Sequence, residues 1–127
     1  MNRQPIIIVA GEPNSVFLEI FFKSLKLNTY KSPLIIVVSK KLLKEQMKEL
    51  GFNIEINDID KKLKDFSKLS NKKINLINID YDFKKCFDKI TSKSNKYIEE
   101  TFKTALYIMK KNSFSKFVNG PVSKKSF

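Results

Sequence analysis

The sequence contains no histidine and only one cysteine among its 127 residues. Without histidine the chain can build neither an imidazole metal site nor a histidine-based acid–base pair. One cysteine cannot form an internal disulfide, which fits a reducing compartment. Because no histidine can act as its base, we interpret Cys86 as a half-buried small apolar residue rather than a nucleophile.

Long hydrophobic runs are absent as well. The longest apolar runs, at residues 6–10 and 34–38, have five residues each, whereas a helix that spans a bilayer needs roughly 20. The N-terminus has no long apolar stretch followed by a small-residue cleavage site, so we expect no secretory signal. These absences predict a cytoplasmic protein with no membrane segment.

Arginine is nearly missing too, since Arg3 is the only one among 25 basic residues, and the net charge is +12. Lysine clusters supply the sequence-independent part of nucleic-acid binding, but recognition of bases and phosphates favours arginine. The lysines are also scattered along every segment. We therefore favour codon drift in an AT-rich genome as the source of the charge. The alternative is a small basic α/β module that binds RNA or another polyanion, with affinity that falls steeply with salt.

Neither the Gly-x-Gly-x-x-Gly signature nor a phosphate-loop Gly-Lys-Ser/Thr signature occurs in the chain. Acidic residues are paired at Glu99 and Glu100 and at Asp80 and Asp82. We expect these carboxylates to face solvent rather than to form a catalytic dyad. In particular, Glu99 should lie near Lys103 on the polar side of a helix.

The length and composition fit one domain with a core of its own, because 42% of the residues are hydrophobic and 30% charged. Apolar runs predict buried strands at residues 6–10 and 34–38. Residues 74–79 and 114–118 read as two further strands, the last of them also buried, and alternation predicts a short half-exposed strand at 52–56. Helical spacing predicts helices at residues 16–27, 40–50 and 94–111. This alternation of strands and helices predicts an α/β fold, a mainly parallel sheet covered by helices.

Capping residues mark several of the predicted helix ends. Asn14 or Ser15 can cap the first helix, Ser39 stands at the cap of the second, and Gly51 stands at its C-terminal stop. Residues 58–73 read as loop or irregular helix, and residues 81–91 are ambiguous.

Two turns that contain glycine and proline follow predicted buried strands. Gly11-Glu12-Pro13 comes after the first strand, and Gly120-Pro121 comes after the last. Ligands of open α/β sheets bind beyond the carboxyl ends of the strands, and a lysine ammonium such as that of Lys124 suits a phosphate or carboxylate. The structural alternative is a pair of tight turns, the first with an exposed glutamate and the second followed by a solvated lysine. We expect both turns to emerge side by side at one rim of the sheet.

Three segments together resemble the 4-hydroxythreonine-4-phosphate dehydrogenase family. Residues 6–20, IIIVAGEPNSVFLEI, are similar to the family's first strand, its Gly-Asp/Glu-Pro turn and the helix start that follows. Residues 96–105, KYIEETFKTA, are similar to a family helix, and residues 119–124, NGPVSK, to the family's Thr-Gly/Ala-Pro-Ile/Val-Asn/His-Lys motif. The chain departs from the pattern at Ser15 and Phe17, which stand at family glycine positions. A bulky Phe17 should crowd the approach of a ligand to the backbone.

The resemblance implies an NAD-dependent enzyme that oxidises the hydroxyl of 4-phosphohydroxy-threonine, with decarboxylation, in the biosynthesis of pyridoxine and pyridoxal phosphate. It also implies a homodimer, a divalent metal (Zn, Mg or Co) held by histidines, and a fold related to the isocitrate and isopropylmalate dehydrogenases. Such a metal polarises the hydroxyl and the later ketone. Because residues 1–127 have no histidine, we expect a single N-terminal α/β segment of a larger two-domain enzyme. Alone, this segment should bind no cofactor and be inactive.

Under this resemblance no catalytic or metal-binding residue falls within the chain. The candidate substrate- and cofactor-binding residues are Asn119, Gly120, Pro121, Lys124, Gly11, Glu12 and Pro13. Ser15 and Phe17 keep open the alternative of a catalytically inactive relative.

Overall fold

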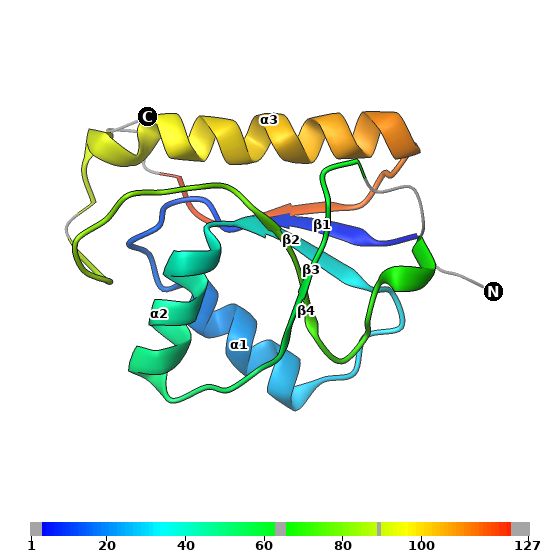
Figure 1. The fold of residues 1–127 in the computed structure, drawn as a ribbon, viewed down its shortest axis with the longest axis horizontal. Coiled ribbons are helices and arrows are strands. Elements are labelled where there is room, and N and C mark those ends of the chain that lie inside the picture. The colour runs from blue at the N-terminus through cyan, green and yellow to red at the C-terminus, as the bar shows by residue number, and fades with distance from the viewer. Residues whose placement is uncertain (1–3, 63–65, 89, 123–127) are drawn as a thin grey trace.

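The computed structural model describes residues 4–62, 66–88 and 90–122, and in them five parallel strands form one sheet (Figure 1). The strand order is β3-β4-β2-β1-β5. The bounds are β1 Ile6–Val9, β2 Leu34–Val38, β3 Ile56–Asp58, β4 Ile74–Asn78 and β5 Phe117–Asn119. The helices in the described residues are α1 Phe17–Leu27, α2 Lys40–Leu50 and α3 Asn95–Asn112, with short 3-10 helices η1 Phe66–Lys68 and η2 Ser92–Ser94. The predicted α/β fold is confirmed.

Helices cover both faces of the sheet, with α1 and α2 on one face and α3 on the other (Figure 1). Side chains alternate along each strand, so Ile7 and Val9 face α3 whereas Ile8 faces α1 and α2. All three side chains are buried. A strand covered on both faces favours apolar residues at every position, which explains the continuous apolar runs of β1 and β2.

The start of β3 differs from the prediction. The strand begins at Ile56, so Phe52 and Ile54 lie ahead of it and not within it. Both are partly buried against the core under α1 and α2, where the ring centroids of Phe52 and Phe22 lie 5.4 Å apart. The alternation of apolar residues therefore reflects side-chain packing without backbone pairing.

The start of β5 differs as well, because the strand begins at Phe117 rather than Phe114. Phe114 is buried just ahead of it, and its N–H donates to the Met109 carbonyl (2.9 Å) at the end of α3. Of the two less legible segments, 58–73 contains η1, and residues 81–88, 90 and 91 form neither helix nor strand.

The predicted caps of α2 are confirmed. The Ser39 hydroxyl accepts from the Leu42 N–H (3.2 Å), and Gly51 ends the helix with a φ of 77°. At α1 the N-cap position belongs to Val16, which has no side-chain cap. The Ser15 hydroxyl, one residue earlier, instead accepts from the Phe17 N–H (3.3 Å).

A buried amide ties β4 to its neighbours. Asn75 is 1% exposed. Its Nδ2 donates to the carbonyls of Leu34 (2.9 Å) and Ser70 (2.7 Å), and its Oδ1 accepts from Asn57 Nδ2 (2.8 Å) and Ser70 N–H (2.9 Å). Every hydrogen-bonding site of this side chain is used, so β4 and the loop before it are locked to the sheet.

We expect Asn75→Asp to lower the free energy of unfolding by about 3 kcal/mol or more, because a buried carboxylate would face two carbonyls. Urea denaturation measures the effect. Asn53→Asp makes the same chemical change at an exposed residue and should stay within about 0.5 kcal/mol of the parent. Equal effects of the two substitutions would contradict the role of Asn75.

Candidate functional site

The carboxyl ends of the parallel strands meet at one rim of the sheet, here called the carboxyl edge. At this edge β1 runs into the turn at residues 11–13 and β5 into the turn at residues 120–122. Ser39 at the start of α2 follows β2, and residues 79–82 follow β4. The edge therefore holds both turns that the sequence singles out.

The turns after β1 and β5 are in direct contact. Gly120 N–H donates to the Val9 carbonyl (2.7 Å), and Glu12 N–H donates to the Pro121 carbonyl (2.8 Å). The expectation that both turns emerge at a common rim is confirmed as far as Val122. Two further residues of the second motif, Ser123 and Lys124, lie outside the described residues.

Both glycines are needed for this contact. Gly11 has a φ of 78°, and a Cβ added there would lie 2.5 Å from the Pro121 carbonyl oxygen. A Cβ added to Gly120 would overlap the Ala10 carbonyl oxygen and come within 2.8 Å of the Phe17 ring. Phe17 therefore packs against the second turn from the α1 side and occupies the space there.

Glu12 is buried, with 3% exposure, so the alternative of a turn with an exposed glutamate is wrong. Its carboxylate accepts from the Asn14 N–H (3.2 Å) and from the Ser94 hydroxyl (3.1 Å). These donors compensate the carboxylate for the loss of water. Because Ser94 directly precedes α3, Glu12 joins the first turn to the start of that helix.

The predicted site residues differ in whether a ligand can reach them. Buried positions are Gly11, Glu12, Pro13 and Gly120. Asn119 and Pro121 are exposed, and Asn119 Nδ2 donates to the carbonyl of Gly120 (2.9 Å). Among the described candidates, only these two present a surface to a ligand.

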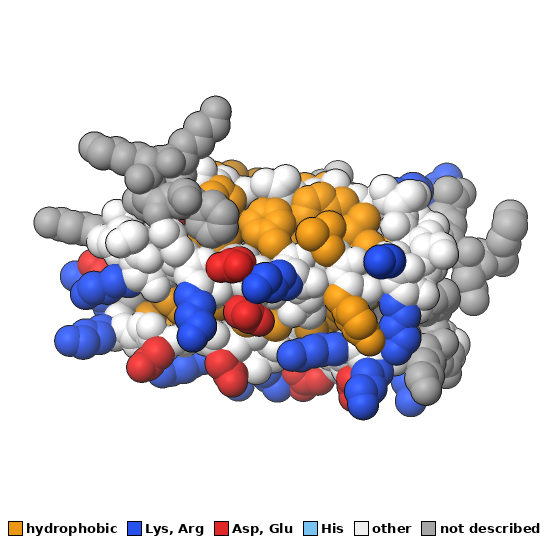
Figure 2. Space-filling view, turned by 90° about the horizontal axis from the view of Figure 1, so that it is seen from above, with side chains coloured by type: hydrophobic (Ala, Val, Ile, Leu, Met, Phe, Trp, Pro, Cys, Tyr) orange, Lys and Arg blue, Asp and Glu red, His pale blue; other side chains and the backbone are white. Residues whose placement is uncertain are grey.

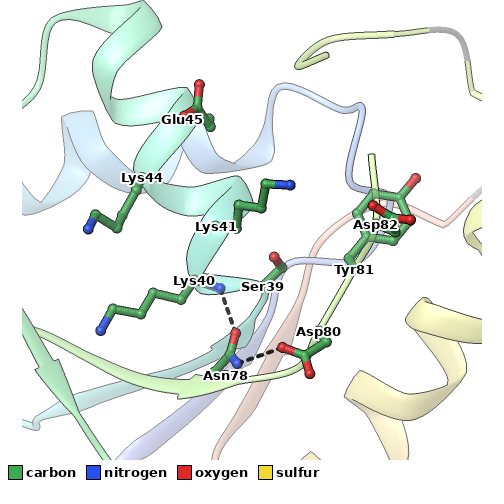
Figure 3. A pocket seen from close by; sticks show the side chains of 9 residues that line it. All are labelled: Ser39, Lys40, Lys41, Lys44, Glu45, Asn78, Asp80, Tyr81 and Asp82. Atoms are coloured by element: carbon green, nitrogen blue, oxygen red, sulfur yellow. Dashed lines mark hydrogen bonds between the residues drawn. The ribbon is translucent and has the colours of Figure 1, made fainter. Parts of the chain in front are cut away.

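A hollow of about 790 Å³ opens at the carboxyl edge between α2 and the segment after β4 (Figure 3). It is lined by Ser39, Lys40, Lys41, Lys44, Glu45, Asn78, Asp80, Tyr81 and Asp82. None of the candidate residues from the sequence is among them. The hollow is therefore a second feature of the edge, next to the paired turns.

A side chain of β4 binds the first N–H group of α2 in this hollow. Asn78 Oδ1 accepts from the Lys40 N–H (2.8 Å), while Asn78 Nδ2 donates to Asp80 Oδ1 (3.0 Å; Figure 3). Lysine and carboxylate side chains line the hollow in equal measure, and Lys40 pairs with Asp58 (2.8 Å). The lining can therefore offer a ligand both charges, with a hydroxyl and an amide between them.

Tyr81 forms a wall between this hollow and a smaller one of about 390 Å³, which reaches Asn14 beside the first turn. Its ring stacks on those of Tyr97 and Phe83, with centroid distances of 4.6 Å and 5.9 Å. Burial raises the pKa of Tyr81, and the negative charges of Glu12 and Asp88 raise it further. The phenol therefore stays protonated and can donate a hydrogen bond at neutral pH.

The described residues at the carboxyl edge offer charges and hydrogen-bonding groups that can bind and orient a ligand. No group of three or more Cys, Asp or Glu residues in the described ranges could hold a metal ion. Burial raises the pKa of the half-buried Cys86 thiol, and Glu45 and Glu49 add to the shift. The thiol stays protonated, as expected of a small apolar residue rather than a nucleophile.

The paired acidic residues face solvent, as expected. Asp80 and Asp82 are exposed, and Glu99 pairs with Lys103 (3.2 Å) on α3. Acidic and basic side chains are interspersed on the face that carries α3 (Figure 2), so no single-sign stripe crosses it. Within the described part of the chain, no helix is long and apolar enough to cross a membrane.

Sequence reasoning missed the hollow beside α2. Its signal was present, because polar Ser39 directly follows the apolar run at residues 34–38 and polar Asn78 follows the apolar pair Leu76 and Ile77. The two positions become neighbours only because β4 pairs with β2. That pairing skips β3 in the chain and cannot be read from local spacing.

Gly11 and Gly51 have nearly equal φ values, so substitutions at these two positions test the contact between the turns. Gly51 has a φ of 77°, and a Cβ there would meet nothing within 4 Å. We expect Gly51→Ala to cost about 1 kcal/mol from backbone strain alone. Gly11→Ala should cost about 3 kcal/mol or more, because the new methyl would displace the second turn. Denaturation curves measure both, and equal costs would show that the turns do not need close approach.

The buried Tyr97 hydroxyl gives a pH test. It accepts from the Ser39 N–H (2.8 Å), and burial, as the largest cause, raises the pKa of Tyr97. The unfolded chain loses this proton above a pH of about 10 whereas the folded chain keeps it, so stability should fall as pH rises beyond that point. Tyr97→Phe should be less stable at neutral pH but decline less steeply above pH ~10. If chemical denaturation shows that the parent and Tyr97→Phe lose stability equally steeply at high pH, the Tyr97 hydroxyl is not the group responsible.

The sequence model of a family described as "Pyridoxal phosphate biosynthetic protein PdxA" matches residues 29–127. No curated protein matches the sequence. Two solved structures of 4-hydroxythreonine-4-phosphate dehydrogenases are similar in fold. The enzyme from Burkholderia phymatum has a TM-score of 0.78 at 18% identity, and that from Klebsiella pneumoniae 0.77 at 16%.

The similarity covers 99% and 98% of this chain but only 38% and 39% of those two proteins. The chain thus spans about two-fifths of their length. At these identities the structures establish a shared fold. The family match covers most of the sequence, and the chain belongs to the PdxA family of pyridoxal phosphate biosynthetic proteins.

Proposed function

We propose that this chain forms the N-terminal part of an NAD-dependent, metal-dependent dehydrogenase that acts in pyridoxal phosphate biosynthesis. Its substrate is 4-phosphohydroxy-threonine, whose hydroxyl is oxidised with decarboxylation, and the whole enzyme is a homodimer of two-domain subunits. The observation that carries the proposal is the family match over residues 29–127. The shared fold with two solved 4-hydroxythreonine-4-phosphate dehydrogenases supports it.

The residues present do not fit the divalent metal. The chain has no histidine, and no group of three potential ligands occurs within the described ranges. We therefore assign the metal ligands and the hydride-transfer site to polypeptide outside residues 1–127, and no chemical step to this chain. Alone, residues 1–127 should be inactive.

In this proposal the chain contributes to the binding of the substrate. The paired turns hold Asn119 and Pro121 at the carboxyl edge, the only exposed members of the described candidates. Lys124 follows them in sequence, and its ammonium would pair with the phosphate or carboxylate of the substrate. The buried candidates Gly11, Glu12, Pro13 and Gly120 act by holding these positions in place.

The test uses the full-length gene product with 4-phosphohydroxy-threonine, NAD and a divalent metal. NADH absorbance should rise with the whole enzyme and stay flat with residues 1–127. We expect Lys124→Ala to lower kcat/KM by roughly 10-fold to 100-fold, mainly through KM, since a charge-assisted hydrogen bond is lost. Lys116→Ala is the matched control. Lys116 lies just before β5, at the amino ends of the strands and so opposite the carboxyl edge. Its substitution should leave kcat and KM unchanged.

Two outcomes would contradict parts of the proposal. An unchanged kcat and KM in Lys124→Ala would show that Lys124 does not bind the substrate. The proposed reaction itself would not be contradicted by that result. Absence of turnover in the full-length protein under all metals would overturn the dehydrogenase assignment. It would favour an inactive relative, a reading supported by the Phe17 ring against Gly120.

A further inference from the structure

The hollow beside α2 lies where two neighbouring strands send the chain to opposite faces of the sheet. β2 and β4 are parallel neighbours. From β2 the chain enters α2 on one face, whereas from β4 it continues past Ile79 and Tyr81, which pack on the α3 side, to α3 on the other face (Figure 1). Connections that diverge in this way open a crevice at the carboxyl ends of the strands, where open α/β sheets bind ligands. The hollow of about 790 Å³ occupies this position.

The start of α2 offers uncommitted hydrogen-bond donors to the hollow. Ser39 is 1% exposed; its hydroxyl accepts from the Leu42 N–H (3.2 Å), but its own hydrogen has no acceptor among the described residues. The Lys40 N–H is bound by Asn78 Oδ1, whereas the Lys41 N–H has no partner in the described part of the chain. Buried polar groups are rarely left without a partner. The buried Ser39 hydroxyl therefore points to a ligand that accepts its hydrogen.

The Lys41 side chain adds a positive charge to these donors. It extends from α2 toward Tyr81 (Figure 3), and its Nζ lies 5.1 Å from the centre of the Phe83 ring. Among the described residues no carboxylate pairs with it, whereas Lys40 pairs with Asp58 (2.8 Å). One ammonium, one backbone N–H and one hydroxyl are thus available to an anion. A phosphate monoester has three terminal oxygens for these donors, and a carboxylate has only two.

The opposite wall of the hollow offers acceptors. Asp80 and Asp82 are exposed and line the hollow from the segment after β4. Asp80 Oδ1 already accepts from Asn78 Nδ2 (3.0 Å), whereas Asp82 accepts no hydrogen bond among the described residues. Ionised carboxylates accept hydrogen bonds from hydroxyl groups, and they repel a bare anion. A ligand that fits both walls therefore carries its anionic group at one end and hydroxyl groups at the other.

We propose that the hollow beside α2 binds a small phosphate monoester that carries hydroxyl groups, with its phosphate at the start of α2 and its hydroxyl groups at Asp82. The volume falls within the range of small-molecule sites, about 300–1,000 Å³. This inference goes beyond the proposed function and does not depend on it. None of the residues assigned there to the substrate lines the hollow, and binding requires neither a metal nor turnover.

Isothermal titration calorimetry on the full-length protein tests the site, with ribose 5-phosphate and inorganic phosphate as probes. Ribose 5-phosphate should bind with a Kd of about 1 mM or lower. Lys41→Ala should weaken the binding of both probes roughly 10-fold, because a charge-assisted hydrogen bond is lost. Lys48→Ala is the matched control. It removes the same charge from an exposed position of α2 outside the hollow, and should change either Kd by less than about 2-fold.

A second variant separates hydroxyl recognition from general attraction between charges. Asp82→Ala should weaken the binding of ribose 5-phosphate roughly 5-fold or more, because its hydroxyl groups lose an acceptor. The same substitution should leave the Kd of inorganic phosphate unchanged or lower it, since a negative charge is removed. Tighter binding of both probes would show that Asp82 only repels anions, and would overturn the recognition of hydroxyl groups.

Three further results would overturn the inference. One is the absence of binding at about 10 mM ribose 5-phosphate, and another is an equal loss of affinity in Lys41→Ala and Lys48→Ala. The third is displacement of the probe by 4-phosphohydroxy-threonine or NAD, which would assign the hollow to the catalytic pocket. Turnover is measured on the same sample. Binding with the expected variant effects in a protein without turnover would support this site and count against the dehydrogenase assignment alone.

Discussion

The backbone contact between the turns at residues 11–13 and 120–122 determines how the carboxyl edge is built. Neither glycine in the contact has a Cβ, so β1 and β5 leave the sheet side by side and each turn satisfies backbone groups of the other. The Glu12 carboxylate extends the contact to the start of α3 through Ser94. Phe17 of α1 packs on the second turn. The helices on both faces of the sheet are thus tied to one pair of turns.

Where burial acts on a single segment, the sequence alone predicts the structure well. A strand such as β1 is covered on both faces and must be apolar throughout, and the caps at Ser39 and Gly51 depend on their own helix only. The start of β3 was not predictable in this way. Phe52 and Ile54 alternate with polar residues because they pack on the core, whereas the strand begins only where β4 offers backbone partners at Ile56.

The candidate site was predictable only in part, for a related reason. Two turns at the ends of parallel strands must share a rim, so their common rim follows from the fold class. Their direct contact also needs β5 to pair with β1. The burial of Glu12 depends on a donor 82 residues away in sequence. The hollow beside α2 likewise depends on β4 lying next to β2, which brings Asn78 to Lys40. Such contacts arise from the order of strands in space.

The buried turn residues bear on what a motif match means. Gly11 and Gly120 are required by a backbone contact between the two turns, so the turn geometry alone explains a match at these positions. Chemistry depends on groups that reach a ligand, and among the described candidates only Asn119 and Pro121 are exposed. Membership of the family and catalysis of its reaction are therefore separate claims. The first rests on the family match over residues 29–127, and the second is proposed for the whole protein.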